Sequence, residues 1–439
     1  MIREGQYTFI RMPSDNVKMV MLKKDQTVNM GKFGSFKVND ILDQPYGHSY
    51  EVLSKGMIRR ASPKELDEEE EWDGANNKLI GQGNDAQKLT QAEIEVLKAK
   101  GLTEEGMDTE IVDSHTSFQL KTEFSKAKYM NRKRQKFGKI FTPMMPGIRT
   151  VCNYFYQKNP TKIMDVRMDT LSQALTMLNA HAHSRLLVVD DAQGMFVASL
   201  LERLGGYGEV VGIHSGEYCN YDVIRYMNLP KAHQSILKTV SWARSNPLTS
   251  SFPFLLADVI EDKAAQAPIG EGRDWTEKER QERQVIIEER RKVRLAALKS
   301  LRETLSRGQF DGLLIATQMD ASDIMTRLLP YLSGSRPIVL YSPHKETLLK
   351  PYALAKDNSE YLNPSLHEPW LREYQVLPGR THPTMSTTGS GGFLLSTLKV
   401  IDCPAEAVGH GKKRAKSEEK AGEEQGPIVD TTEKKAKLE

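Results

Sequence analysis

The most specific chemical pattern in the chain is the stretch Val188-Val-Asp-Asp-Ala-Gln-Gly-Met-Phe196. It follows an apolar run and precedes a helix-like segment, which is the setting of a nucleotide-binding strand, loop and helix. Such a loop ordinarily carries three glycines after an acidic residue, because glycine lets the backbone approach the ligand and adopt positive φ. Counted from Asp190, the three glycine positions hold Ala192, Gly194 and Phe196.

Two further positions at the mouth of such a site also lack the expected side chains. A carboxylate that would bind ribose hydroxyls belongs at the end of the next strand, where His214 stands, and Glu217 is an imperfect substitute. The tip of a later strand carries Ala316 and Thr317, neither of which can orient or deprotonate a substrate base. Each loss removes a different requirement, so the sequence predicts a cofactor scaffold without its chemistry. The alternatives are a shifted register and a Rossmann-like domain that never bound a nucleotide.

Other catalytic and metal-binding patterns are weaker. His181 and His183 are one residue apart but have no third ligand nearby, so we interpret them as a loop pair. The stretch Gly389-Ser-Gly-Gly lacks the lysine and hydroxyl of a phosphate-binding loop, and a tight turn is the favoured interpretation. The three cysteines have neither metal spacing nor an even number, which favours a reducing compartment.

A basic stretch between residues 125 and 139 is the candidate for binding an anionic partner. It has no acidic residue, and Tyr129 and Phe137 are interleaved with the charges. Lysine and arginine side chains would contact phosphates and release counterions, while the aromatic rings could stack on unpaired bases. The candidate phosphate-binding residues are Lys126, Lys128, Arg132, Lys133, Arg134, Lys136 and Lys139, with Arg149 and Arg380 as weaker candidates. Nothing in this stretch selects RNA over DNA by itself. The alternatives are a solvated helical face and a nuclear-import signal.

The elements that must position these residues divide into a β-rich beginning and an α/β remainder. Three short β-prone runs separated by turn residues predict a small β-barrel or sandwich: Tyr7–Ile10, Val17–Leu22 and Phe36–Val38. From about residue 160 helices and strands alternate, which predicts a parallel sheet covered on both faces. The expected helices are Thr170–Ala180 and a long charged one over 274–307. The expected strands are Leu186–Val189, Val210–His214, Phe254–Asp258, Gly312–Ala316 and Pro337–Tyr341, with the last ones between Tyr374 and Ile401.

Composition and charge set the domain organisation. The 439 residues are 39% hydrophobic, enough for real cores, and the net charge of +3 matters only where charges cluster. No apolar leader or membrane-length run is seen, so a soluble intracellular chain without a membrane partner is expected. The predicted parts are a β-barrel-like domain over 1–60, an acidic loop and linker over 61–121, a basic RNA-binding segment over 122–160, a Rossmann-like domain over 161–403, and a disordered charged tail over 404–439.

Five motifs give the chain a family resemblance. In this order the sequence resembles the non-catalytic subunit of the eukaryotic tRNA (adenine-58-N1)-methyltransferase, over nearly all of residues 1–401. The motifs are Gly31-Lys-Phe-Gly-Ser-Phe, Gln44-Pro-Tyr-Gly-His-Ser-Tyr-Glu-Val, Thr122-Glu-Phe-Ser-Lys-Ala-Lys-Tyr, Arg167-Met-Asp-Thr-Leu-Ser-Gln-Ala-Leu and Tyr374-Gln-Val-Leu-Pro-Gly-Arg-Thr-His-Pro-Thr-Met.

The resemblance implies a Rossmann-like class I methyltransferase domain with a degenerate cofactor site, preceded by the β-barrel-like domain. It implies no cofactor in this chain; S-adenosylmethionine is expected in a catalytic partner that methylates the T-loop adenosine at position 58. The two chains would pair and assemble into a nuclear heterotetramer, with this chain supplying tRNA-binding surface. The tail clusters Lys412-Lys-Arg-Ala-Lys and Lys434-Lys-Ala-Lys are compatible with nuclear import. The alternatives are an active but divergent S-adenosylmethionine-dependent RNA methyltransferase and a nuclear RNA-binding scaffold without a methyltransferase partner.

Overall fold

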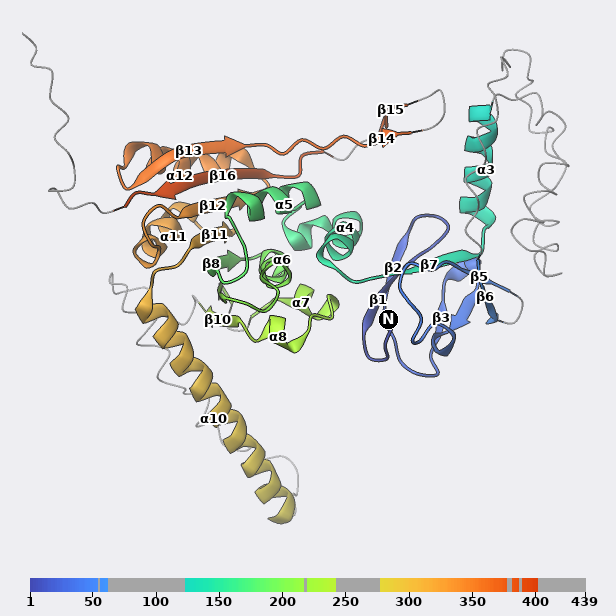
Figure 1. Ribbon diagram of the computed structural model, residues 1–439, viewed down its shortest axis with the longest axis horizontal. Helices are drawn as coiled ribbons and strands as arrows, with labels where there is room; N and C mark the ends of the chain where they lie inside the picture. The colour runs from blue at the N-terminus through green and yellow to red at the C-terminus, as the bar shows by residue number, and fades with distance from the viewer. Residues whose placement is uncertain are drawn as a thin grey trace, which may run out of the picture. The chain divides into compact units, whose positions relative to one another are not determined.

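The computed structural model of the chain describes residues 1–53, 56–61, 123–216, 219–241, 277–376, 381–386 and 389–401. Within these residues an N-terminal antiparallel sheet is followed by a larger sheet flanked by helices (Figure 1). The strand expected at Phe254–Asp258, the residues Glu217 and Arg380, most of the acidic linker and the charged tail lie outside the described residues.

The N-terminal sheet has five antiparallel strands in the order β2-β1-β7-β5-β6. Its strands are β1 (Tyr7–Arg11), β2 (Val17–Met21), β5 (Tyr50–Val52), β6 (Ile58–Arg60) and β7 (Ile140–Met144). The central strand β7 pairs with β1 at Ile10↔Pro143 and with β5 at Tyr50↔Phe141. The structure therefore differs from the expected boundaries, because residues placed by sequence in the basic segment over 122–160 complete the domain placed over 1–60.

A short hairpin covers the core of this N-terminal part. Its strands are β3 (Thr27–Asn29) and β4 (Ser35–Lys37). The ring of Phe36 in β4 stacks on Phe141 in β7, with ring centroids 4.2 Å apart, and both rings are fully buried. The three strands expected from sequence are confirmed as β1, β2 and β4.

The larger sheet has seven strands in the order β10-β9-β8-β11-β12-β16-β13, and only β16 runs antiparallel to its neighbours. The strands are β8 (Arg185–Asp190), β9 (Glu209–His214), β10 (Leu237–Ser241), β11 (Gly312–Ala316), β12 (Pro337–Ser342), β13 (Tyr361–His367) and β16 (Phe393–Lys399). This doubly wound order, with the reversed strand β16 next to the edge strand β13, is a Rossmann-like class I methyltransferase sheet, as expected. The carboxyl end of β8 lies where the strand order reverses, which is where open α/β sheets bind ligands.

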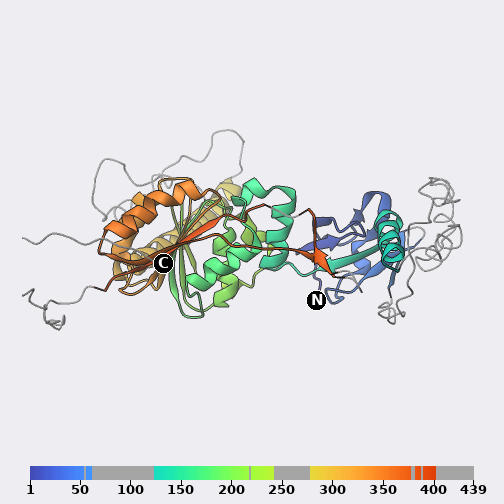
Figure 2. The ribbon, with the colours of Figure 1, turned by 90° about the horizontal axis from the view of Figure 1, so that it is seen from above.

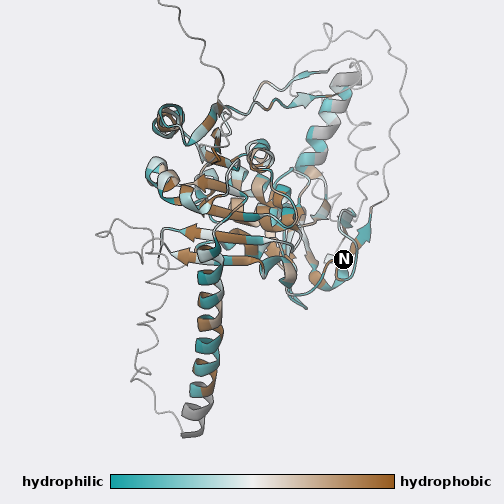
Figure 3. Cartoon of the chain, turned by 60° about the vertical axis from the view of Figure 1, so that its left-hand side comes forward, coloured by the Kyte–Doolittle hydropathy of each residue, from teal (hydrophilic) through white to brown (hydrophobic). Residues whose placement is uncertain are grey.

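Helices cover both faces of this sheet (Figure 2). Along β8, Leu186 and Val188 face one core while Leu187 and Val189 face the other, because successive strand side chains point in opposite directions. The first core is covered by α4 (Ile148–Lys158), α5 (Met168–Met177), α6 (Met195–Leu204) and α7 (Asp222–Tyr226), with α8 (Lys231–Gln234) following. The second is covered by α10 (Glu277–Arg307), α11 (Ala321–Leu328) and α12 (Lys345–Asp357). Hydrophobic residues accordingly concentrate in the strands (Figure 3).

An ion cluster joins α10 to the sheet. Glu209 in β9 accepts hydrogen bonds from Arg185 Nε at 2.8 Å, Arg307 at 2.5 Å and Lys238 Nζ at 3.2 Å. Although burial acts to raise it, the bonds from Arg185 and Lys238 lower the pKa of Glu209 to about 2.

The strand beside β9 is β10, which the sequence pattern did not predict.

Two elements stand outside these layers. The helix α3 (Glu123–Phe137) leads directly into β7. Between β13 and β16 the chain forms an excursion that contains a separate two-stranded ladder, β14 (Tyr374–Gln375) with β15 (His382–Pro383). Among the described residues, no helix has the length and apolar character needed to cross a membrane.

Candidate functional site

The loop between β8 and α6 has the backbone of a cofactor site but is stabilised by its own side chains. Asp190 ends β8 and accepts hydrogen bonds from the backbone N–H of Ala192 at 2.7 Å and of Val197 at 3.0 Å. Its carboxyl group therefore binds donors at the start of α6, where an anionic ligand group would otherwise be favoured. Burial raises the pKa of Asp190 to about 6, against the opposing effect of these backbone donors.

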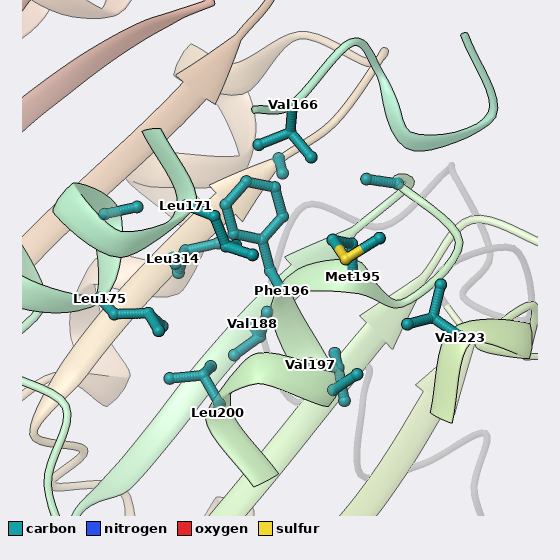
Figure 4. Packing of buried hydrophobic residues seen from close by; sticks show 14 of the residues in the cluster. Val166, Leu171, Leu175, Val188, Met195, Phe196, Val197, Leu200, Val223 and Leu314 are labelled. Carbon is teal, nitrogen blue, oxygen red and sulfur yellow. The ribbon is translucent and has the colours of Figure 1, made fainter. Parts of the chain in front are cut away.

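Phe196, in the third glycine position, points into the core (Figure 4). Its side chain is fully buried among residues that include Val166, Leu171 and Leu314. Its ring also contacts Tyr341 of β12, with centroids 5.3 Å apart. A side chain of this size in the third glycine position prevents a ligand from approaching the backbone. Here Phe196 is instead part of the packing between the helices and the sheet.

Tyr221 makes the close approach to the remaining glycine. Gly194 has a φ of 76°, and a Cβ built on it would lie 2.6 Å from Cβ of Tyr221. A Cβ on Gly212 in β9 would lie 2.9 Å from the Tyr221 hydroxyl, which donates to the carbonyl of Ile213 at 3.3 Å. The space left by these two glycines is thus filled by a tyrosine from the same chain.

Asp191 cross-links the strand ends at the mouth of the loop. It accepts hydrogen bonds from Ser215 Oγ after β9 at 3.2 Å, from Thr317 Oγ1 after β11 at 2.7 Å and from the backbone N–H of Gln318 at 3.1 Å. His214, in the position of the ribose-binding carboxylate, is buried, and its Nδ1 lies 2.9 Å from the Gly216 carbonyl. The polar groups at this edge form hydrogen bonds with one another, so they stabilise the fold of the chain.

These residues do not fit an S-adenosylmethionine site. The glycine approach is occupied by Tyr221, the third glycine position by Phe196, and the ribose position by an imidazole. Ala316, at the tip of β11, is buried and offers no acid or base. Sequence reasoning identified three of these substitutions, but it missed Tyr221 and Asp191 because their roles depend on contacts between separate loops.

The predicted RNA-binding residues gather on one helix. Lys128, Arg132 and Lys136 are exposed and spaced four residues apart, so they form one row along α3. Tyr129, Lys133 and Phe137 form the neighbouring row.

The neighbouring row brings charge and aromatic rings together. Lys133 Nζ lies 5.2 Å from the Tyr129 ring centroid and 5.6 Å from that of Phe137. Lys136 Nζ lies 4.9 Å from the Phe137 ring. The helix thus places basic side chains beside aromatic rings. Of the two rings that the sequence offered for stacking on bases, Phe137 is buried and Tyr129 is partly exposed.

The other predicted residues have different positions. Lys126 also lies on α3 and is half-buried, and Lys139 lies between α3 and β7. Arg134 belongs to α3, but its side chain is not among those that the structure describes. Arg149 is exposed in the first turn of α4, on a different element, and Arg380 lies outside the described residues.

The chain matches a family model described as the Gcd10p family over residues 1–284. It is 30% identical to a Schizosaccharomyces pombe protein, over 100% of this chain and 98% of that protein, and 30% identical to one from Kluyveromyces lactis, over 97% and 92%. A Mus musculus protein is 29% identical over 91% of this chain and 88% of its own length. All three are named as the non-catalytic subunit TRM6 of tRNA (adenine(58)-N(1))-methyltransferase.

Two solved structures are similar at low identity. The tRNA (m1A58) methyltransferase TrmI from Aquifex aeolicus has a TM-score of 0.46 at 12% identity, with 91% of this chain and 99% of that chain covered. A SAM-dependent O-methyltransferase from Thermotoga maritima has a TM-score of 0.49 at 11% identity, with 92% and 96% covered.

Proposed function

The chain belongs to the Gcd10p family, and from this premise we propose that it is the non-catalytic subunit of a tRNA (adenine-58-N1)-methyltransferase. The observation that carries the proposal is the filled loop between β8 and α6. Phe196 stands in a glycine position and Tyr221 fills the space beside Gly194, while the sheet around them is intact. A chain that keeps this scaffold without a fitting cofactor site is suited to support a catalytic partner.

The catalytic partner supplies the methyl-transfer chemistry in this proposal. S-adenosylmethionine binds the partner, and this chain binds none. The residues at the mouth of its own loop serve packing, because Asp191 accepts three hydrogen bonds from hydroxyl and backbone donors and Ala316 has no proton to exchange.

The contribution of this chain to substrate binding is tRNA contact through α3. The row Lys128, Arg132 and Lys136 would contact phosphates, and its spacing along one helix face supports this role. Lys133, held over two aromatic rings, would stiffen the neighbouring row. We further propose nuclear location and assembly as a heterotetramer with two copies of each chain, as the family resemblance implies.

Titration calorimetry with S-adenosylmethionine tests the division of labour. The chain alone should release no binding heat, and its complex with the catalytic subunit should bind one molecule per catalytic chain. Methylation of tRNA should require both chains. Binding by the isolated chain would instead favour an active, divergent methyltransferase, because the loop around Phe196 would then accept the cofactor.

The isolated catalytic subunit is the matching control. If it binds S-adenosylmethionine and methylates tRNA fully without this chain, the subunit role proposed here is wrong. If this chain binds RNA but never co-purifies with a methyltransferase, a separate RNA-binding scaffold is the better description.

A further inference from the structure

A cluster of exposed apolar side chains lies in the excursion between β13 and β16. We define the arm as the two described stretches of this excursion, residues 370–376 and 381–386. Its large apolar residues are exposed by 44% to 92%: Trp370 78%, Leu371 44%, Tyr374 54%, Val376 75% and Met385 92%. Single exposed apolar residues are ordinary, but five within one short excursion indicate a binding surface.

The size of this surface fits a protein partner. An aromatic side chain offers roughly 150–250 Å² when fully exposed, so Trp370 and Tyr374 at these exposures offer on the order of 250 Å², to which the three aliphatic side chains add. A stable interface buries about 800 Å² on each partner, and the arm supplies a large part of that area. Because the proposed function gives the chain a catalytic partner, the occupant to which we commit is an apolar surface of the catalytic subunit.

The arm needs support from outside itself. Its only ladder within the described residues pairs two residues of β14 with two of β15, and a two-stranded hairpin is marginal on its own in water. One further backbone bond joins Thr384 N–H to the Glu373 carbonyl at 2.9 Å. The direction of the arm must therefore be set where its two ends leave the sheet.

A buried arginine binds the chain on both sides of the arm. Arg167, only 5% exposed, donates to the carbonyl of Gly389 at 2.6 Å and to the carbonyl of Pro369 at 3.3 Å. Its other donors form a bidentate pair with Asp169, at 2.6 and 2.8 Å. The planar guanidinium group can make all four bonds at once, whereas a lysine ammonium at the same place cannot.

An aromatic contact fixes the second end. A Cβ built on Gly392 would lie 2.5 Å from Cε2 of Tyr341, so the tyrosine ring packs directly against the backbone there. The Tyr341 hydroxyl donates to the Met164 carbonyl at 2.7 Å, and the Tyr341 ring also contacts the ring of Phe196. The residue that fills the third glycine position thus supports the ring that supports the arm.

We propose that Arg167 and Tyr341 are positioning residues for the arm, that the arm binds the catalytic subunit, and that Phe196 supports Tyr341 in this role. The proposal rests on the proposed function and deepens it by naming the surface that receives the partner. It also gives one residue of the altered cofactor loop a use, because Phe196 both fills a glycine position and supports the ring that holds the arm.

The test compares two glycine-to-alanine variants three residues apart. Gly392→Ala should push the backbone away from Tyr341, whereas a Cβ on Gly389 would have nothing within 4 Å. Binding of each full-length variant to the immobilised catalytic subunit is measured by surface plasmon resonance. We expect Gly392→Ala to raise the dissociation constant on the order of tenfold or more, mostly through faster dissociation, and Gly389→Ala to bind as the wild type does.

A second set of variants keeps the test decisive if Gly392→Ala does not fold. Arg167→Lys keeps the charge but cannot bind Asp169, Gly389 and Pro369 together, so it should also weaken binding and speed amide exchange in residues 370–376. Trp370→Ala removes an exposed ring and should weaken binding without lowering the melting temperature. The control Tyr207→Ala removes a ring that is 61% exposed elsewhere and should change neither.

Three outcomes would overturn the inference. Wild-type affinity of folded Arg167→Lys and Gly392→Ala would remove the positioning role. A core variant away from the arm, Leu305→Ala, could lose affinity as much as Arg167→Lys, which would make the effect one of general stability. Trp370→Ala could alter self-association of this chain and leave the catalytic subunit's binding unchanged, which would assign the arm to a second copy. If the wild-type chain does not bind the catalytic subunit at all, the proposed function itself fails.

Discussion

At the scale of single residues, the loop between β8 and α6 shows how a binding site becomes a core. Asp190 is buried, and its carboxyl oxygens accept hydrogen bonds from the N–H groups of Ala192 and Val197. Burial nevertheless raises its pKa to about 6, from an ordinary value of 3.8. A carboxyl group with a raised pKa favours the protonated form in the folded state, so its ionisation at neutral pH acts against folding.

The variant Asp190→Asn tests this assignment through the pH dependence of stability. The folded pKa lies about two units above the unfolded value, so ionised Asp190 costs the wild type roughly 3 kcal/mol above pH 6, a cost absent below about pH 4. The asparagine mimics the protonated acid at every pH. The difference in unfolding free energy between the variant and the wild type should therefore favour the variant more at pH 8 than at pH 4, by up to that amount. Urea denaturation at several pH values measures the difference, and a constant difference would contradict the buried, protonatable state.

Much of this residue-scale picture could be predicted from the sequence, and the limit is physical. Ala192, Phe196, His214 and Ala316 occupy positions whose chemistry is set by local spacing, so their meaning is readable along the chain. Tyr221 and Asp191 act across loops that the chain brings together only on folding. Arg167 lay within a motif that carried the family resemblance, but its hydrogen bonds to Pro369 and Gly389 span more than two hundred residues.

At the scale of elements, periodicity predicted the central strands and missed those whose pairing is distant. β8, β9, β11 and β12 are continuous apolar runs and were expected near their observed bounds. β7 contains a proline and sits in the middle of an antiparallel sheet, where its Pro143 pairs with Ile10 of β1, 133 residues earlier, so no local pattern assigns it to the N-terminal domain. The consequence for function is that α3, which precedes β7, is anchored in that sheet.

Charge reversal on α3 tests its proposed contact with tRNA. In the assembled complex, Arg132→Glu with Lys136→Glu should weaken tRNA binding at every salt concentration and lower the slope of log affinity against log salt by about 2. The reason is that each lost phosphate contact releases roughly one counterion fewer. Filter binding from low to moderate salt measures both quantities. The matched control, Lys345→Glu with Lys356→Glu, changes the same charge on exposed positions of α12 and should have little effect; equal losses in both pairs would reduce the α3 effect to net charge alone.

At the scale of the whole molecule, the N-terminal sheet and the methyltransferase domain share a built junction. Asn228 Oδ1 accepts from Tyr7 N–H at 2.9 Å, and Asn228 Nδ2 donates to the Tyr7 carbonyl at 2.8 Å, so one side chain pairs with both backbone groups of Tyr7 at the start of β1. Tyr7 also contacts Tyr226 edge-on at 5.1 Å, and Phe9 contacts Tyr154 at 5.3 Å. Since α3 is fixed to the N-terminal sheet and the arm to the methyltransferase domain, this junction sets the distance between the proposed RNA and partner surfaces.

Asn228→Ala should therefore loosen the two surfaces from each other while each domain stays folded. The Tyr7 N–H and carbonyl would turn to water, and the aromatic contacts alone would hold the junction. We expect a single cooperative melting transition to broaden or split in calorimetry, binding to the catalytic subunit to stay unchanged, and tRNA affinity of the complex to fall by several fold, because α3 is no longer held at one place before binding. Asn16→Ala, in an exposed turn of the same sheet, is the control and should leave all three measurements at their wild-type values. If Asn228→Ala weakened partner binding and spared tRNA binding, the junction would serve the arm, and the proposed separation of the two surfaces between the domains would be wrong.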